Sequence, residues 1–214
     1  MIFMAILNED VLKQIKEKMS ELKDPVKILY FKPDKDCDHC SQIEEILKEV
    51  CSIDDKISVE THSEKDEKAK EYEIDITPAI VVEGKEKRFV RYFGMPSGYE
   101  FATFITDIVD VSKNETHLPQ EIADEVKKID FPLRMMVFVT PTCPYCPGAV
   151  KLAHDFALLN PNIKGDMISA VEFRELSEKH GVMGVPKTVL NEKVSLEGAY
   201  PADVILKKIQ ELKK

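Results

Sequence analysis

Four of the five cysteines in this chain form two Cys-x-x-Cys motifs. The first is Cys37-Asp38-His39-Cys40, and the second is Cys143-Pro144-Tyr145-Cys146, 106 residues further along the chain. Two thiols at this spacing can exchange with a disulfide, because one thiolate attacks it and the other resolves the mixed disulfide. The same spacing occurs in zinc sites, where two such pairs usually meet across a short loop. The long separation of the motifs therefore favours two dithiol centres over one metal site.

The surroundings of the two motifs match. Each follows an apolar, β-prone run and precedes a helical pattern. Pro78 lies 38 residues after the first motif, and Pro186 lies 40 residues after the second, each just before an expected strand. Gly94 and Gly198 then precede the last helix of each half. Landmarks that recur at a nearly constant offset indicate an internal duplication of one domain.

The patterns predict the same order of elements twice. A first helix, capped by Asn8, begins the chain, and the motif helices run to Cys51 and Leu159. The other expected helices cover 64–73, 97–112, 118–129, 172–180 and 201–213, and the expected strands cover 26–31, 57–61, 79–83, 87–92, 134–139, 166–171, 187–190 and 193–196. The polar stretch 113–116 carries no apolar period, so we place the junction between two domains there, with residues 1–115 and 116–214 on either side.

This order resembles the thioredoxin fold, and two such units in one chain resemble the protein disulfide oxidoreductases of hyperthermophilic archaea and bacteria. The resemblance implies an α/β fold of two tandem thioredoxin-like domains, each a central mixed β-sheet flanked by helices. The second tetrad is also that of glutaredoxins. The first is similar to the tetrad of protein disulfide isomerase, but Asp38 replaces the usual glycine.

Position predicts a role for each cysteine. A cysteine at a helix N-terminus faces free N–H groups and the positive end of the helix dipole, which lower its pKa. Cys37 and Cys143 are therefore the expected nucleophiles, and Cys40 and Cys146 the resolving thiols.

The resemblance assigns the two prolines as well. In thioredoxin-like folds a cis proline lies opposite the dithiol and leaves the preceding backbone free to pair with an extended substrate. This implies substrate binding at Thr77-Pro78 and Val185-Pro186, with both bonds cis. Without the resemblance, a trans proline at a strand start would be expected.

Neighbouring residues are expected to tune the two sites. His39, when protonated, would stabilise a thiolate at Cys37, although it is equally interpreted as an exposed loop histidine. Asp36 and Asp38 would raise the pKa of that thiol. In the second motif Pro144 suits the first helical turn and Tyr145 is neutral, so Cys143 is the thiol expected to ionise more readily.

Two further points remain open. Thioredoxins keep a buried aspartate in the strand before the cysteines as a proton acceptor, and neither half has an acidic residue there. Any proton acceptor must therefore come from elsewhere in the chain. Cys51 lies near the apolar face of the first motif helix and is interpreted as a small buried hydrophobe rather than a redox group.

The composition of the chain excludes some classes of binding partner. A net charge of −9 argues against nucleic acid and anionic membranes. Met1–Leu7 lacks the basic region of a signal peptide and is interpreted as a first strand or an anchor for the first helix. Abundant Lys and Glu fit a thermophile's surface, and we expect a cytoplasmic protein.

The leading functional hypothesis is an enzyme that reduces, forms and isomerises protein disulfides. It needs no cofactor beyond its cysteine pairs, and a thioredoxin reductase-like flavoprotein is the expected electron donor. An alternative is an electron relay from a flavoprotein reductase to a peroxidase, similar to the duplicated N-terminal region of alkyl hydroperoxide reductase flavoproteins. There only the second unit keeps its cysteines, whereas both units keep them here. A third hypothesis is a metal or iron–sulfur carrier.

Overall fold

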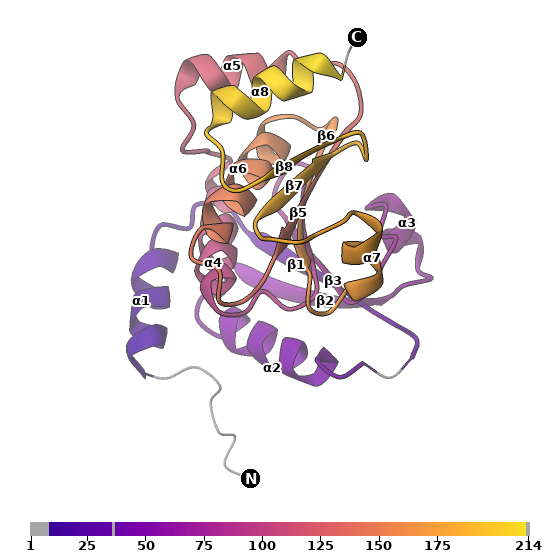
Figure 1. Ribbon diagram of the computed structural model, residues 1–214. Coiled ribbons are helices and arrows are strands. Elements are labelled where there is room, and N and C mark those ends of the chain that lie inside the picture. The colour runs from indigo at the N-terminus through magenta and orange to yellow at the C-terminus, as the bar shows by residue number, and fades with distance from the viewer. Residues whose placement is uncertain (1–8, 36, 213–214) are drawn as a thin grey trace.

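The chain folds around one mixed β-sheet of eight strands (Figure 1). This computed structural model describes residues 9–35 and 37–212, so the expectations for Met1–Leu7 and for the Asn8 cap lie outside the described residues. Within the described ranges, no helix is long and apolar enough to cross a bilayer.

The elements follow one order twice. The first half contains α1 (Glu9–Met19), β1 (Val26–Lys32), α2 (Cys40–Cys51), β2 (Ile57–Ser63), α3 (Glu67–Glu71), β3 (Ala79–Glu83), β4 (Phe89–Phe93) and α4 (Tyr99–Lys113). The second contains α5 (Gln120–Lys127), β5 (Leu133–Val139), α6 (Cys146–Leu159), β6 (Ile163–Ser169), α7 (Arg174–Lys179), β7 (Lys187–Leu190), β8 (Val194–Glu197) and α8 (Ala202–Glu211).

The strand order β2-β1-β3-β4-β6-β5-β7-β8 repeats one four-stranded pattern. In each half the first strand pairs in parallel with the second and antiparallel with the third, and the third pairs antiparallel with the fourth. The halves meet where β4 pairs in parallel with β6, from Phe89↔Lys164 to Phe93↔Ile168. The repeats therefore share one continuous sheet.

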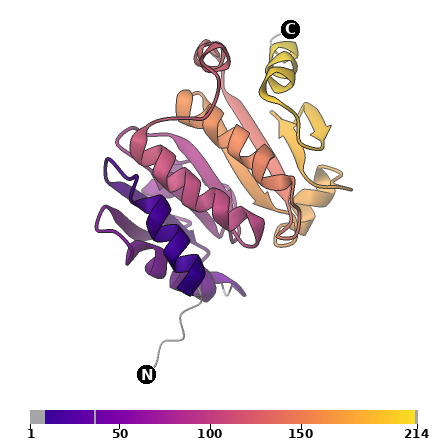
Figure 2. The ribbon, with the colours of Figure 1, turned by 90° about the vertical axis from the view of Figure 1, so that its left-hand side faces the viewer.

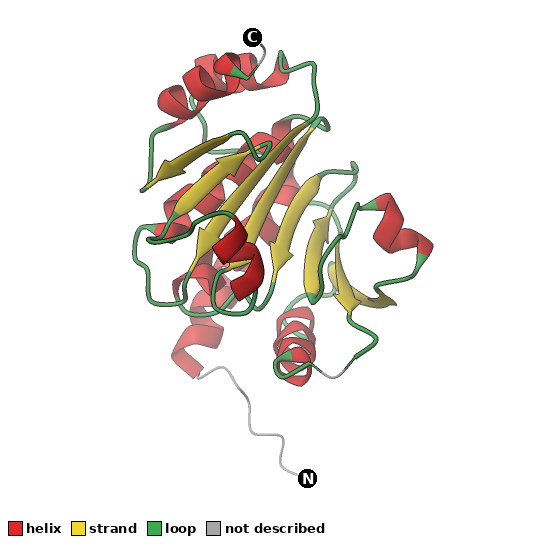
Figure 3. Ribbon diagram, turned by 45° about the vertical axis from the view of Figure 1, so that its right-hand side comes forward, coloured by secondary structure: helices red, strands yellow, loops and turns green. Residues whose placement is uncertain are grey.

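Helices cover both faces of the sheet, so strand side chains are buried on both. Ile28 and Tyr30 belong to one core and Leu29 and Phe31 to the other, as the two-residue period of a strand requires. The first core lies beneath α1, α2, α4, α5, α6 and α8. Figure 2 shows α1, α4 and α6 together on that side. The second core lies beneath α3 and α7, and Figure 3 shows α7 on the opposite face from α4 and α6. Both cores contain residues of both halves.

The predicted elements agree with the structure in type and order, and the differences are local. The expected strand 166–171 begins three residues earlier, at Ile163, and ends at Ser169. Gly165 and Asp166 have low strand propensity, but their tertiary contacts favour a strand. A Cβ at position 165 would lie 2.5 Å from the carbonyl oxygen of Ala153, so this glycine lets α6 approach the sheet.

Further differences lie at the ends of helices and strands, and β4, expected at 87–92, spans Phe89–Phe93. The expected helix 64–73 shortens to α3, because Glu73 takes a left-handed backbone conformation with φ 51°. α4 ends at Lys113, and Asn114 caps it with φ 52°. The predicted junction at 113–116 thus falls at the end of α4, while the division into two domains remains a prediction.

A buried ion pair lies at the seam between the halves. Arg91 of β4 donates from Nε and Nη2 to the two carboxylate oxygens of Asp166 on β6, at 2.7 and 2.8 Å. Its Nη1 donates to the carbonyl oxygens of Tyr72 and Glu73. Arg134 of β5 also donates to Asp166, at 2.6 Å. Burial alone would raise the pKa of Asp166, but the two guanidinium groups outweigh it and lower that pKa.

Asp166→Asn should destabilise the fold by about 3–5 kcal/mol, because it leaves the Arg91 guanidinium buried without a countercharge. Urea unfolding followed by circular dichroism measures this loss. The matched control Arg91→Met/Asp166→Leu removes both charges and should cost less than Asp166→Asn alone, since Arg134 keeps its ion pair with Asp75. A free energy of unfolding for Asp166→Asn within about 1 kcal/mol of wild type would contradict this role.

Candidate functional site

The first Cys-x-x-Cys motif lies at the N-terminal end of α2. Cys37 and Cys40 are joined by a disulfide with their Cα atoms 5.3 Å apart. Cys40 is the first residue of the helix and is buried, with 3% of its surface exposed. Cys37 precedes the helix by three residues and is half-buried. The outer sulfur therefore belongs to the more accessible residue, and the inner one is shielded.

The second motif repeats this arrangement at the start of α6. Cys143 and Cys146 form a disulfide with a Cα–Cα distance of 5.5 Å, and Cys146 is fully buried. The backbone N–H of Cys146 donates to Sγ of Cys143 at 3.1 Å. Such a donor favours a negative charge on the accepting sulfur. Cys143 itself is only 8% exposed, less than Cys37.

Of the residues between the cysteines, Pro144 lies elsewhere than expected. Pro144 lies before the N-cap residue Tyr145, so it stands outside the first helical turn, which contains Pro147 instead. Tyr145 is 72% exposed. His39 is the N-cap residue of α2, and its Nδ1 lies 3.4 Å from Oε1 of Gln42. Asp36 lies outside the described residues, and Asp38 is exposed.

Both predicted cis bonds are present, at Thr77–Pro78 and Val185–Pro186. Each proline carbonyl accepts a hydrogen bond from a glycine N–H in the same half. Gly94 donates to Pro78 at 2.9 Å, and Gly198 donates to Pro186 at 2.7 Å. Both glycines have positive φ, 88° and 102°, which glycine adopts without steric cost. Gly94 and Gly198, which recur at equivalent places in the sequence, thus fix the backbone at each proline through a hydrogen bond.

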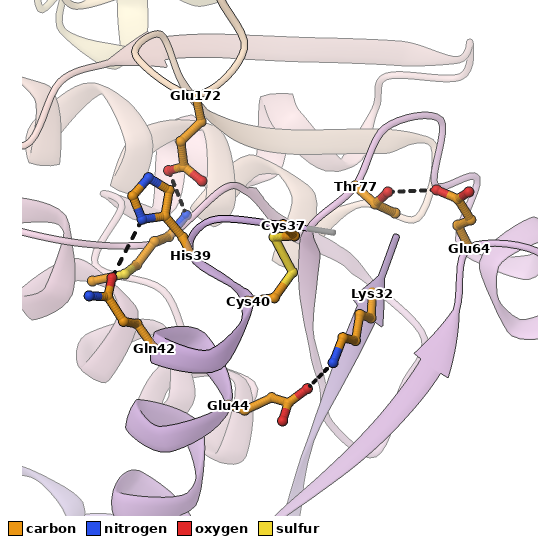
Figure 4. Close-up of a disulfide and its surroundings, with 10 residues drawn as sticks. Lys32, Cys37, His39, Cys40, Gln42, Glu44, Glu64, Thr77 and Glu172 are labelled. Atoms are coloured by element: carbon orange, nitrogen blue, oxygen red, sulfur yellow. Dashed lines mark hydrogen bonds and ion pairs between the residues drawn. A yellow bond between two sulfur atoms is a disulfide. The ribbon is translucent and has the colours of Figure 1, made fainter. Parts of the chain in front are cut away.

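A cleft of about 820 Å³ opens beside the first disulfide. Cys37, Thr77 and Pro78 line it from the first half, and residues 171–176 of the second half line it as well. In Figure 4 the disulfide lies between Thr77 on one side and His39 and Glu172 on the other. The Thr77 hydroxyl donates to Glu64 at 2.7 Å, which fixes its side chain. The structure therefore brings together the predicted residues of the first site.

The second site contacts the first half in turn. The backbone of Gly98, which precedes α4, lies so close to the carbonyl of Pro141 that no Cβ would fit there. The N–H of Tyr99 donates to the same carbonyl at 3.2 Å. The start of α4 is therefore seated on the loop that leads into Cys143.

The next residue of α4 is a buried acid that the sequence analysis did not single out. Glu100 is 1% exposed, and neither carboxylate oxygen has a hydrogen bond of ordinary geometry. Burial raises its pKa to about 7, against the opposing effects of His154 on α6 and of Thr103. Glu100 can therefore take up and release a proton near neutral pH, beside the loop of the second dithiol.

Glu100 adjoins a buried polar cluster between α4 and α6. Asp107 of α4 accepts from the hydroxyl of Tyr92, and its carboxylate lies 2.5 Å from Nδ1 of His154. The other ring nitrogen of His154 contacts the carbonyl of Arg91 at 3.1 Å. Burial would lower the pKa of Lys151, but nearby carboxylates, Asp107 first among them, raise it overall. In the sequence, this cluster is indicated only by polar residues three to seven positions apart along α4. That spacing places them on one side of the helix but does not identify the residues that they contact.

Cys51 contributes a thiol of another kind. It is the last residue of α2 and packs against the first core, partly buried. Burial raises the pKa of this thiol to about 11. It is thus protonated at neutral pH, which agrees with its interpretation as a small hydrophobe.

Comparison with known proteins supports the fold. Residues 133–211 match the thioredoxin domain family. The chain is 28% identical over 205 residues to the F subunit of alkyl hydroperoxide reductase of Staphylococcus aureus (strain NCTC 8325 / PS 47), which covers 95% of this chain and 38% of that protein. It is 29% identical over 165 residues to an NADH dehydrogenase of Bacillus subtilis (strain 168), covering 77% of this chain and 30% of the relative. The chain thus spans well under half the length of these curated relatives.

Two solved structures share the whole architecture. A protein disulfide oxidoreductase from Aeropyrum pernix K1 superposes with a TM-score of 0.87 at 24% identity, over 96% of this chain and 94% of that one. The F subunit of alkylhydroperoxide reductase from Enterococcus faecalis (V583), as the C503A mutant, gives 0.86 at 24% identity, over 94% and 98%. The predicted α/β class, with a mixed sheet flanked by helices in tandem thioredoxin-like units, is confirmed.

Glu100→Gln should remove a pH-dependent loss of stability. Because the folded protein holds the Glu100 proton more tightly than the unfolded chain does, stability should fall as pH rises from about 4.5 through about 7, by up to about 3 kcal/mol. The glutamine variant should lack this decline. Urea unfolding at pH 5, 6, 7 and 8 measures it, with Glu175→Gln, an exposed acid, as the matched control. Parallel pH curves for Glu100→Gln and wild type would contradict the assignment.

Proposed function

We propose that this protein is a dithiol–disulfide oxidoreductase that acts on protein disulfides through both motifs. The observation that carries the proposal is geometric. Two cysteine pairs, at equivalent places in two repeats, each close into a disulfide at the start of a helix, with the second cysteine buried. A pair that opens and closes in this setting carries two electrons without a further group.

The proposed reduction has two steps. The thiolate of the outer cysteine attacks a substrate disulfide and forms a mixed disulfide, while one substrate sulfur leaves as a thiolate. The inner cysteine, once deprotonated, attacks the sulfur of the outer one and releases the second substrate thiolate. The motif ends as a disulfide, the substrate as a dithiol, and the reverse sequence oxidises a substrate. A reductase-like flavoprotein in the cytoplasm is the electron donor of this proposal.

Glu100 is our candidate for the proton acceptor at the second motif. The inner thiol of Cys146 is fully buried and must lose its proton before it attacks. A carboxyl with a pKa of about 7, on the segment seated against the Cys143 loop, suits that transfer. The exchange rate of Glu100→Gln at pH 6 and pH 8, in a Cys37→Ser/Cys40→Ser background, tests the role.

An electron relay between a flavoprotein and a peroxidase is the second candidate. Its support is the similarity to the F subunit of alkyl hydroperoxide reductase, over 95% of this chain. Relay and oxidoreductase use the same exchange chemistry and differ in the partner that receives the electrons. A relay should support peroxide consumption by a thiol peroxidase with a flavoprotein reductase present, and should reduce insulin poorly.

Cys143 should be the principal nucleophile. Its sulfur accepts the Cys146 N–H, and no acidic residue adjoins it in the sequence, so its thiolate is the better stabilised of the two. Cys143 is less exposed than Cys37, which should slow its attack on a substrate. We expect the greater stability of its thiolate to outweigh this effect. In insulin reduction with dithiothreitol, Cys143→Ser should lose most of the activity and Cys37→Ser less. The reverse ranking would show that access to the sulfur governs the rate.

Isomerisation should need both motifs, whereas simple reduction needs one. The tetrads differ in charge, so the two sites are expected to differ in redox potential and to alternate as reductant and oxidant. Refolding of scrambled ribonuclease by Cys37→Ser/Cys40→Ser and by Cys143→Ser/Cys146→Ser measures this. Full isomerase activity in either double variant would rule out cooperation.

A further inference from the structure

The second half of the chain builds one wall of the cleft over the first dithiol. The segment Val171–Leu176, between β6 and the first turns of α7, lines this cleft together with Cys37, Ile76 and Pro78. Val171 is 50% exposed, unusual for a large apolar side chain in this protein. One wall of the cleft at the first dithiol is therefore formed by residues of the other repeat.

Two contacts fix this wall to the first half. The pairing of β4 with β6 continues to Phe93↔Ile168, so the chain leaves β6 at the level of Gly94. Oε1 of Glu172 then accepts the N–H of Met95 at 2.9 Å. A Cβ on Gly94 would lie 2.6 Å from that same oxygen and 2.8 Å from Cβ of Ser169, so a side chain there would displace this contact. The wall is thus anchored next to the chain that carries Pro78.

The second dithiol lacks the corresponding wall among the described residues. β8 holds the place in the second half that β4 holds in the first, and it is the last strand of the sheet. No described strand pairs with its outer edge, so no following segment is directed over Cys143 in this way. The repeats are alike, but their position in the shared sheet makes the two sites different.

The lining of the cleft favours a particular occupant. The apolar groups of the lining belong to Pro33, Ile76, Val171, Phe173 and Leu176. Its charges are of both signs and belong to Lys35, Asp38, Arg174 and Glu175. Mixed charges do not select a strongly charged ligand, whereas the apolar groups can bury aliphatic side chains. A volume of about 820 Å³ between two walls admits a short chain segment.

We propose that the first dithiol is selective for cysteines in extended, unfolded segments with apolar neighbours, and that Val171 of the second half is a specificity-determining residue for it. This rests on the proposed oxidoreductase function. Apolar residues beside a cysteine are accessible mainly in unfolded chains. The extended segment would lie between Thr77-Pro78 and the 171–176 wall, where its disulfide meets Cys37. Exchange proceeds as above, with dithiothreitol as the electron source in the assay.

The test separates the two sites. Cys143→Ser/Cys146→Ser leaves only the first dithiol, and Cys37→Ser/Cys40→Ser leaves only the second. The probes are disulfide-linked dimers of a short peptide with Leu and Val beside its cysteine, and of one with Asp and Gly there. With dithiothreitol, the first-site enzyme should show a kcat/KM about tenfold higher for the apolar peptide. Val171→Asn should remove this preference, whereas the rate on bis(2-hydroxyethyl) disulfide, a small uncharged disulfide, should fall far less.

Matched controls make the result specific. Met183→Asn places the same polar group on another exposed apolar residue of the second half, outside the cleft lining, and should not change the first-site rates. Val171→Asn in the second-site enzyme should not change its rates either. An unaltered peptide preference in the first-site enzyme, or an equal loss on the small disulfide, would overturn the proposal. So would an inactive first-site enzyme beside an active second-site enzyme, whereas failure of both enzymes on every peptide would overturn the oxidoreductase function itself.

Discussion

The parallel pairing of β4 with β6 is the contact on which the rest of this structure depends. It turns two four-stranded repeats into one sheet, and each face of the seam carries a buried polar group. On one face Arg91 and Asp166 form a two-point ion pair, and on the other Asp107, which accepts from Tyr92, contacts His154 of the second half. A buried charge without its partner is costly, so these groups tolerate one register of the two strands and disfavour others. They specify how the halves join more sharply than apolar packing alone would.

This join explains why duplicated motifs do not give duplicated sites. A strand that pairs on one side of the seam also sets the position of the loop that follows it. β6 thereby places Glu172 and Val171 over the first dithiol, while the chain after β4 seats Gly98 and Tyr99 on Pro141, beside the second. Each dithiol thus receives a segment from the other half, but a different segment. The first gains a cleft wall, and the second gains the start of α4, seated on the loop before Cys143.

Local patterns were enough to predict most of the fold. The tetrads, Pro78, Pro186 and the paired glycines recur at nearly equal intervals, because each depends on contacts within its own repeat. The hydrophobic runs of β1 and β5 predicted strands, since both faces of the sheet are covered. The start of β6 was missed because Gly165 is a poor strand residue in isolation. It is suited to a strand only once α6 packs against it. The roles of Glu100 and Glu172 were likewise beyond a local reading, since each depends on the opposite half.

The shared sheet also limits how far each repeat can be regarded as an independent unit. Both hydrophobic cores contain residues of both halves. Separation at the α4–α5 connection would expose one edge of β4 and one edge of β6, and would leave Arg91 without Asp166. It would also remove the start of α4 from the loop before the second dithiol, and the 171–176 wall from the first. An isolated repeat would keep its cysteine pair but lose the surroundings that distinguish it from the other pair. The difference between the two sites is therefore a property of the joined molecule, and neither tetrad alone accounts for it.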